Sequence, residues 1–234
     1  MKIAIMQPYL FSYIGYFQLM NAVDEFVVYD NIEFTKKGWI NRNRILVNGK
    51  DDYISFPLKK DSDFLHIKDR FLAEIWMTER KKILNRITES YRKAPYFSGI
   101  YPLIEQIFLF EDMNLFRFIL NSLTELKDFL GIKTSLIISS TIPIDHQLKA
   151  EKKVIEICKV RKADTYINPI GGTELYNKDD FKKEGIDLYF LKTGNIQYKQ
   201  FNNDFVPFLS IIDVMMFNST EEIKKHLESS FTLL

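Results

Sequence analysis

The chain has 234 residues, of which 46% are hydrophobic and 27% charged, an ordinary composition for a globular protein. Its formal net charge of +1 lacks the basic excess of a nucleic-acid-binding protein, so nucleic acid is not an expected partner. This length can bury a full core. We expect residues 1–234 to form a single α/β domain with a helical insertion at about 70–130.

Neither a disulfide nor a membrane span is expected. Cys158 is the single cysteine, and its core spacing in a predicted helix indicates a buried thiol rather than a nucleophile. Strand residues follow Met1 directly, without a cationic and then apolar leader. No stretch reaches the length of about 18 apolar residues that a membrane span requires. We therefore expect a cytoplasmic protein, either a monomer or a homodimer.

The first 30 residues predict a β-α-β unit. Apolar strands at 2–6 and 26–29 flank residues 14–23, whose apolar side chains recur at helical spacing. A crossover of this size joins parallel strands and is nearly always right-handed. Residues 45–58 then predict a hairpin with a turn at Asn48 and Gly49.

Helical periodicity dominates the middle of the chain, and alternating strands and helices return after it. The predicted helices are 73–90, 101–110, 113–130 and 150–160, and the predicted strands are 135–139, 165–168 and 186–191. The end of the chain predicts a loop and two helices, the last capped by Ser219 or Thr220. Together these patterns predict an α/β fold with a parallel-sheet, Rossmann-like core, a helical insertion and C-terminal helices.

Loops that leave the carboxyl ends of neighbouring parallel strands meet in one crevice, where open α/β sheets bind ligands. In this chain such loops carry residues suited to a small anionic molecule. The predicted substrate-binding residues are Gln7, Tyr9, Tyr13, Gly15, Lys36, Asn41, Arg42, Asn43, Arg44, Ser139, Ser140, Thr141, Gly171, Gly172 and Tyr176.

Most of these residues also have a purely structural interpretation. Gly15 permits close approach of a ligand to the backbone, but a tight strand-to-helix turn would need it equally. Arg42 and Arg44 present guanidinium forks for carboxylate or phosphate, although a solvated edge strand also carries such residues. The hydroxyls of Ser139–Thr141 and the N–H groups of Gly171–Gly172 could hold an anion or simply form turns.

Few residues are suited to acid–base chemistry. We predict that the catalytic acid or base is Asp30, at the end of the second strand, or His66, in a polar connection. His146 lies in a second polar connection, where it could also be a general base. No two of the three histidines have the spacing of a metal site, so no metal is predicted. Asp213 follows apolar residues and could be a buried carboxylate that holds a loop or an arginine in place. A buried carboxylate needs such a partner, because an unpaired buried charge is costly.

The segments QPYLFSYIGYFQLMNAVDEFVVYDNIEF, GWINRNRI, SST, INPIGG and PFLSIIDVMMFN resemble the WbqC-like protein family over essentially the whole chain. Members of that family occur with genes for bacterial O-antigen and other surface polysaccharides. The resemblance implies a transferase of O-antigen (lipopolysaccharide) biosynthesis that attaches an aminoacyl, glycine-like, or acyl group to a nucleotide-linked amino sugar. It implies an anionic sugar nucleotide and an activated acyl or aminoacyl donor as partners, and it identifies no cofactor.

The N-terminal plan is also similar to nucleotidylyltransferases and pantothenate synthetases of the HUP class. Those enzymes bind ATP phosphates with an H-x-G-H signature and a later I-S-S-T segment, which residues 138–141 match. Tyr13 and Tyr16 stand where the two histidines would be, so the cationic donors are absent. The alternative to a transferase is therefore a non-catalytic nucleotide-binding or sugar-nucleotide-binding protein on a degenerate nucleotidylyltransferase scaffold.

Overall fold

A computed structural model describes residues 1–234 and contains a six-stranded and a two-stranded sheet. The large sheet has the order β5-β2-β1-β6-β7-β8, in which the first five strands are parallel and β8 is antiparallel to β7. Its strands are β1 (Lys2–Met6), β2 (Glu25–Val28), β5 (Ser135–Ile138), β6 (Thr165–Pro169), β7 (Asp187–Thr193) and β8 (Phe231–Leu233). The chain moves outward from β1 through β2 to β5 and then returns to β6 on the other side of β1. This is the doubly wound order, and the predicted α/β fold class is confirmed.

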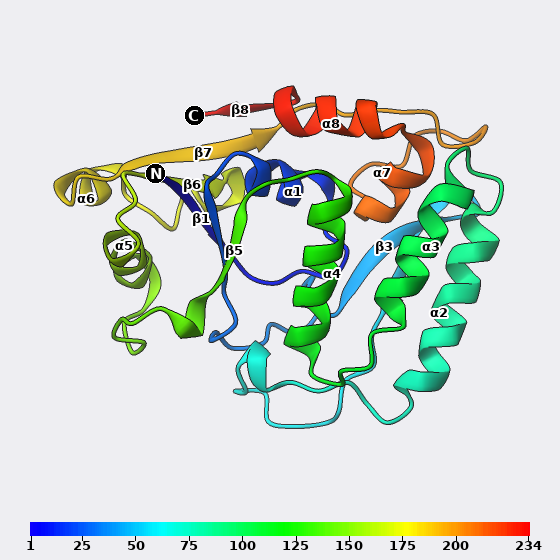
Figure 1. The fold of residues 1–234 in the computed structure, drawn as a ribbon, viewed down its shortest axis with the longest axis horizontal. Helices are drawn as coiled ribbons and strands as arrows, with labels where there is room; N and C mark the ends of the chain where they lie inside the picture. The colour runs from blue at the N-terminus through cyan, green and yellow to red at the C-terminus, as the bar shows by residue number, and fades with distance from the viewer.

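The helices divide between the two ends of the molecule (Figure 1). Their bounds are α1 (Ile14–Asn21), α2 (Trp76–Tyr91), α3 (Phe97–Phe108), α4 (Leu115–Phe129), α5 (Ala150–Val160), α6 (Lys178–Lys183), α7 (Ile211–Phe217) and α8 (Thr220–Ser229). Helices α5 and α6 lie at one end, whereas α2 and α3 form the other end with α4 beside them. Short 3-10 turns, η1 (Ile67–Asp69), η2 (Ser139–Thr141) and η3 (Ile170–Gly172), complete the chain. No helix is both long and apolar enough to cross a membrane.

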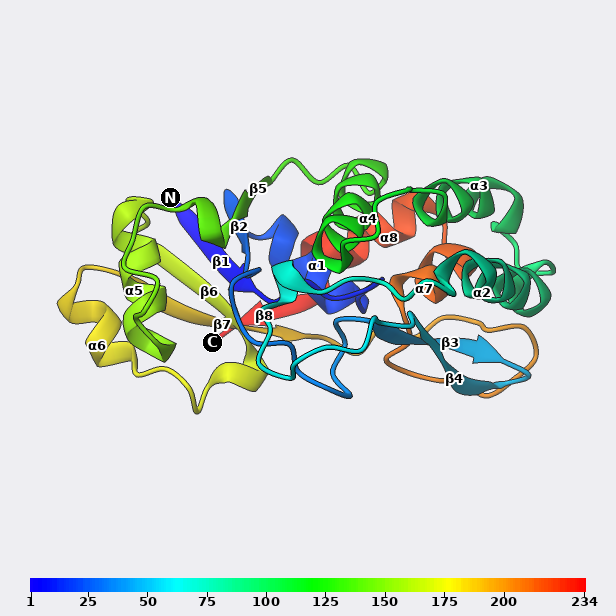
Figure 2. The same ribbon diagram turned by 90° about the horizontal axis from the view of Figure 1, so that it is seen from below.

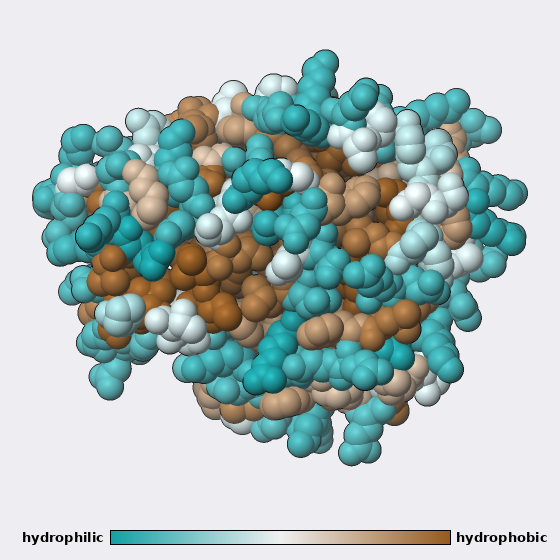
Figure 3. Space-filling model, viewed as in Figure 1, coloured by the Kyte–Doolittle hydropathy of each residue, from teal (hydrophilic) through white to brown (hydrophobic).

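The large sheet is covered on both faces because successive strand residues point in opposite directions. In β1, Ala4 belongs to a cluster of 47 buried residues that includes α1 and the helices α2–α4. Its neighbours Ile3 and Ile5 belong to a second cluster of 13 buried residues, which joins the sheet to α5 and α6. Figure 3 shows apolar residues on the surface between α4 and α5, where the half-buried residues of edge strand β5 lie.

A separate hairpin, β3 (Arg42–Val47) and β4 (Lys50–Ser55), forms the two-stranded sheet. Its turn places Asn48 at φ 51° and Gly49 at φ 76°, as the tight hairpin turn predicted for this pair requires. Figure 2 shows the hairpin at the end of the molecule that holds α2, α3 and α7, away from α5 and α6.

Two elements were not predicted. Helix α6 has six residues, too few for a helical period to be visible, and Asn177 caps it by accepting a hydrogen bond from the backbone of Asp179. Strand β8 exists only because it pairs with the end of β7, a long-range contact that no local pattern reveals. The predicted cap of the last helix is confirmed: Ser219 and Glu222 form a reciprocal capping box at the start of α8.

Candidate functional site

Asp30 and Ser140 meet at the carboxyl edge of the large sheet, because Asp30 follows β2 and Ser140 follows the neighbouring strand β5. The backbone N–H of Ser140 donates to Oδ1 of Asp30 at 2.8 Å, and its hydroxyl donates to Oδ2 at 2.6 Å. Asp30 is only 2% exposed, whereas Ser140 is half-buried and reaches the surface. The pair therefore holds a buried carboxylate directly behind an accessible hydroxyl.

His146 is fixed beside this pair by Asn31. The hydroxyl of Ser139 donates to Oδ1 of Asn31 at 2.9 Å, and Nδ2 of Asn31 lies 2.9 Å from Nδ1 of His146. An amide nitrogen can only donate, so Nδ1 accepts and the neutral imidazole carries its proton on Nε2. The ring is otherwise exposed, and it therefore offers an N–H donor to a ligand rather than a base.

Lys153 supplies a positive charge to the same place. It lies on the buried face of α5 and is 4% exposed, with Nζ 5.0 Å from the centre of the Tyr29 ring and 3.3 Å from the backbone oxygen of His146. None of the ion pairs includes it. Burial lowers the pKa of its ammonium, an effect that Asp30 and Asp145 oppose.

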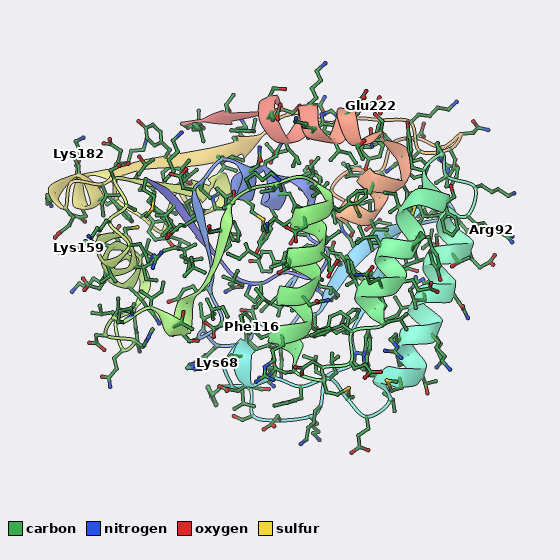
Figure 4. The ribbon with its side chains drawn as sticks, viewed as in Figure 1. Lys68, Arg92, Phe116, Lys159, Lys182 and Glu222 are labelled. Atoms are coloured by element: carbon green, nitrogen blue, oxygen red, sulfur yellow. The ribbon has the colours of Figure 1, made fainter.

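We call Asp30, Asn31, Ser139, Ser140, His146 and Lys153 the carboxyl-edge cluster. Lys68 of η1 lies nearby, since its backbone N–H donates to the carbonyl of Asp30 at 3.1 Å and its charge further lowers the pKa of Lys153. Figure 4 shows Lys68 beside the lower end of α4, on the side of the ribbon where β2 and β5 end. The cluster thus combines one fixed carboxylate, one buried cation and several neutral donors, with Lys68 as a second cation beside it.

Tyrosines extend this cluster toward β6. Burial, and secondarily the proximity of Tyr176, raises the pKa of Tyr29 to about 12. Tyr176 packs edge-on against Tyr166 of β6, with ring centres 5.7 Å apart. The predicted binding residue Tyr176 is therefore close to the ring that Lys153 contacts. The side chain of Gln7, at the end of the central strand β1, is half-buried and takes part in no hydrogen bond.

The remaining loops at this edge form turns. Gly172 packs so closely against the Asn168 side chain that a Cβ atom would collide with its amide, whereas Gly171 faces open space. Thr141 is exposed, and its hydroxyl donates back to the carbonyl of Ile138 at 2.8 Å. Packing thus explains the glycine at position 172, and a local turn explains the Thr141 hydroxyl, whereas Gly171 faces open space. A role of these three residues in binding stays a prediction.

Asn43 lies in a second group, away from the carboxyl-edge cluster. It is buried in β3, and its Nδ2 donates to the carbonyls of Leu10 at 2.8 Å and Phe11 at 3.0 Å. Phe11 has a φ of 42°, and its carbonyl also accepts from the Ser210 hydroxyl at 2.7 Å. Asn43 and Ser210 therefore hold the loop after β1 in a backbone conformation that residues other than glycine rarely adopt. Asn41 is similar in kind, donating to the carbonyl of Phe56 at 2.9 Å.

Arg42 and Arg44 form a ladder with two aromatic rings on the outer face of the hairpin. The Arg42 guanidinium lies 4.5 Å from the Tyr53 ring centre, and that of Arg44 lies 5.6 Å from the Trp39 ring centre. Arg44 also pairs with Asp51 at 2.9 Å. Asn43 of this strand is buried whereas Arg42 and Arg44 are half-buried, and the guanidinium groups already have partners within the protein.

The other predicted residues also lie outside the cluster. Tyr13 precedes α1 and packs against Phe208, and the half-buried Tyr9 packs against the Tyr16 ring. Lys36 is exposed and pairs with Asp63 at 2.7 Å. Exposed His66 pairs through its backbone with Glu33, and no hydrogen bond joins its ring to the cluster.

Gly15 has a packing reason that sequence alone could not reveal. A Cβ atom at this position would lie 2.5 Å from Oγ1 of Thr193 on β7. The absence of a side chain therefore lets α1 approach β7, and whether a ligand also needs this glycine stays a prediction.

Asp213 has the expected partners, but none of them is an arginine. Tyr198 and Gln200 donate to its Oδ1, each at 2.7 Å, and Tyr91 donates to Oδ2 at 2.9 Å. The Tyr91 hydroxyl in turn accepts from the backbone N–H of Leu46 at 2.8 Å. Burial raises the pKa of Asp213, and this network ties α2, α7 and the hairpin together.

Lys153 and Asn31 were not predicted as site residues, and His146 was noted only as a possible base. A signal for Lys153 was present: it precedes Val154 and lies four residues before Ile157, on the face of α5 that is buried. A lysine on the otherwise apolar face of a helix is the sequence pattern that indicates a buried cation of this kind.

The fold and the cluster together define a doubly wound α/β protein with a polar, partly cationic site at the carboxyl edge of its sheet. The chain belongs to the WbqC-like protein family, whose model matches residues 7–225. It is similar to the "Uncharacterized protein Rv1507c" of Mycobacterium tuberculosis, with 29% identity over 230 residues that cover 97% of each chain. No solved structure matches the chain.

Proposed function

We propose that this protein is a transferase of bacterial surface-polysaccharide (O-antigen) biosynthesis that attaches an acyl or aminoacyl group to a nucleotide-linked amino sugar at the carboxyl-edge cluster. The observation that carries the proposal is Lys153, a nearly buried ammonium at the ligand-binding edge of the sheet with no carboxylate in ion-pair distance. A phosphate of a sugar nucleotide would supply the missing negative charge. Lys68 and the Nε2–H of His146 would add further donors for it.

The chemistry requires that an amine lose a proton as it attacks an activated carbonyl carbon. The amine nitrogen of the sugar forms a C–N bond, and the bond from that carbon to the leaving group of a thioester or ester donor breaks. The accessible Ser140 hydroxyl can accept the amine proton while it passes its own proton to Asp30, 2.6 Å away. The leaving group departs with the electron pair, and His146 can donate a hydrogen bond to it.

The first test is binding of nucleoside diphosphate sugars by calorimetry. Lys153→Met should weaken binding by about tenfold or more, because a charge-assisted contact to phosphate is lost. Lys152→Met is the matched control, since Lys152 is the exposed neighbour on the same helix. Unchanged affinity of Lys153→Met would exclude the cluster as the phosphate site.

The second test separates binding from chemistry. Asp30→Asn should abolish product formation, followed by mass spectrometry with acyl and aminoacyl thioesters and esters as donors, while sugar-nucleotide affinity stays within about threefold of the wild type. A variant that loses binding and stability together would instead give Asp30 a structural role.

The alternative is a non-catalytic sugar-nucleotide-binding protein. It is favoured by Tyr16, which lies where the HUP enzymes have a histidine: it is buried and donates to the carbonyl of Gln7 at 3.1 Å. That hydroxyl holds the backbone and is not directed at a ligand. Saturable binding without turnover for any donor and acceptor pair would support this alternative, and any turnover would exclude it.

A further inference from the structure

Arg70 is a buried guanidinium that lies outside every site described above. It directly follows η1, and its carbonyl accepts from the backbone N–H of Leu115 at 2.9 Å, at the start of α4. The residue is 5% exposed, and its guanidinium carbon lies 5.0 Å from the centre of the Phe34 ring. Phe34, in the segment that follows β2, therefore lies over the buried guanidinium, and the backbone of Arg70 is joined to the start of α4.

The guanidinium of Arg70 has no hydrogen-bond partner in the protein. Its Nε and Nη2 are both shielded from water and unpaired, and no ion pair includes the residue. Nη1 also lacks a partner but is not shielded, so it marks the side from which solvent reaches the group. Of the two terminal nitrogens, Nη1 is therefore open to solvent and Nη2 is closed off.

No carboxylate of the chain neutralises this charge at close range. Asp63 is the acid whose pKa Arg70 helps to lower, but its carboxylate is exposed and is hydrogen-bonded by Lys36 at 2.7 Å, which is the larger cause. The neighbouring side chains Asp69 and His66 are exposed, and Lys68 adds a second positive charge. Asp69, next to Arg70, is exposed, and Asp63 is already paired with Lys36, so neither forms an ion pair with Arg70.

Such a group is costly for a folded protein to keep. A buried lysine can lose its proton, but an arginine remains charged at every accessible pH. A buried charge without a partner destabilises the fold unless a counter-charge satisfies it. The planar N–H fork matches two oxygens of a carboxylate or phosphate, which is the ligand chemistry that arginine binds best.

We infer that Arg70 is the receptor for an oxyanion, a carboxylate or phosphate group of a small molecule, which binds at Nη1, the terminal nitrogen that solvent reaches. Phe34 supports the face of the guanidinium and fixes the direction of the fork. The inference does not rest on the transferase proposal, since Arg70 is not a member of the carboxyl-edge cluster. It places a second anion site beside η1, two residues along the chain from Lys68.

The test uses the full chain in thermal-shift titrations at constant ionic strength with inorganic phosphate, pyrophosphate and malonate as probes. The melting temperature of the wild type should rise saturably with phosphate or pyrophosphate if the ligand is a phosphate group, and with malonate if it is a carboxylate. Arg70→Met should weaken that binding by about tenfold or more. Arg92→Met is the matched control, because Arg92 is an exposed arginine at the far end of α2 from Lys68 (Figure 4).

A purely structural role for Arg70 predicts that Arg70→Met melts below the wild type. The anion-site inference predicts the opposite: without anion, the variant should melt at or above the temperature of the wild type, because methionine keeps much of the apolar stem and removes the unpaired charge. Should that variant fail to fold, Arg70→Lys keeps the charge but lacks the fork, and its affinity should still fall. Wild-type affinity in both variants, or no saturable binding by the wild type, would overturn the inference. Loss of oxyanion binding in Lys153→Met but not in Arg70→Met would assign the anion to the carboxyl-edge cluster instead.

Discussion

Lys153 and Arg70 are the residues at which this protein departs most from the rule that buried charges are paired. Lys153 is 4% exposed and Arg70 is 5% exposed, and neither takes part in an ion pair. Structural elements seldom retain such groups, because an apolar side chain of similar volume packs as well at lower cost. Buried cations without an acidic partner, in a fold that binds ligands at its sheet edge, favour binding as their role.

Stability should respond to the charge of Lys153. Lys153→Met should have an equal or higher free energy of unfolding at pH 7 than the wild type, measured by urea denaturation. The reason is that burial lowers the pKa of this lysine in the folded state. The unfolded chain therefore binds the proton more tightly, so the wild type should gain stability as the pH rises from the lowered folded value toward 10.5.

The variant lacks this titration, so its advantage over the wild type should shrink in that alkaline range. Lys152→Met, on the exposed side of the helix, should show no such change of difference with pH. A loss of about 2 kcal/mol or more in Lys153→Met at pH 7 would show that the contacts of the lysine stabilise the fold more than its burial costs.

At the scale of elements, side-chain amides rather than regular hydrogen-bond ladders hold the site loops. Asn43 of β3 reaches two carbonyls of the loop after β1, across 32 and 33 residues of sequence. The hairpin thus acts as a support for the loop between β1 and α1. This explains why the Asn/Arg turn and the first loop both look specific in the sequence although they do not share the cluster at the sheet edge.

The contact between α1 and β7 can be tested through Gly15. Gly15→Ala should destabilise the fold by about 1–3 kcal/mol, because the new methyl group would meet Oγ1 of Thr193. In a Thr193→Ala background the same change should be neutral or stabilising, because alanine favours helix over glycine. Urea unfolding of the four proteins gives the coupling energy directly.

Gly99→Ala in α3 is the control for that cycle, since nothing lies within 4 Å of its missing side chain. It should be neutral or stabilising in either background. Equal destabilisation by Gly15→Ala with and without Thr193 would mean that the helix turn itself, and not the contact with β7, requires the glycine.

At the scale of the whole molecule, the six-stranded sheet carries a large buried cluster on one face and a small one on the other. The small cluster of 13 residues contains Cys158, the only cysteine, which is fully buried. Burial raises the pKa of its thiol to about 12, so the reactive thiolate is scarce as well as inaccessible.

This thiol should report on the cooperativity of the whole fold. Labelling by a disulfide reagent should be slow in the native protein and should become fast with the same urea midpoint as the loss of circular dichroism. The reason is that both clusters pack on the same strands, so neither face should open alone. Labelling that precedes the spectroscopic transition would show instead that α5 and α6 unfold separately.

Local patterns in the sequence determined the β-α-β unit, the Asn48-Gly49 hairpin, the helices of the insertion and the cap at Ser219, because each depends on neighbours within a few residues. They also predicted that Asp30 and the serines after β5 would lie at one sheet edge, since parallel strands end on the same side. Strand β8 escaped prediction because it depends on a distant partner.

Only the tertiary structure decided which of these residues meet. Asp30 and Ser140 are 110 residues apart in the chain, and Asn31 and His146 are 115 apart. Whether a cation finds a polar partner depends on such distant contacts, so the sequence could not show that the guanidinium groups of Arg42 and Arg44 are hydrogen-bonded while that of Arg70 is not. The chain's composition and periodicity specify the framework, and the packing of remote segments specifies the charges that remain free to bind.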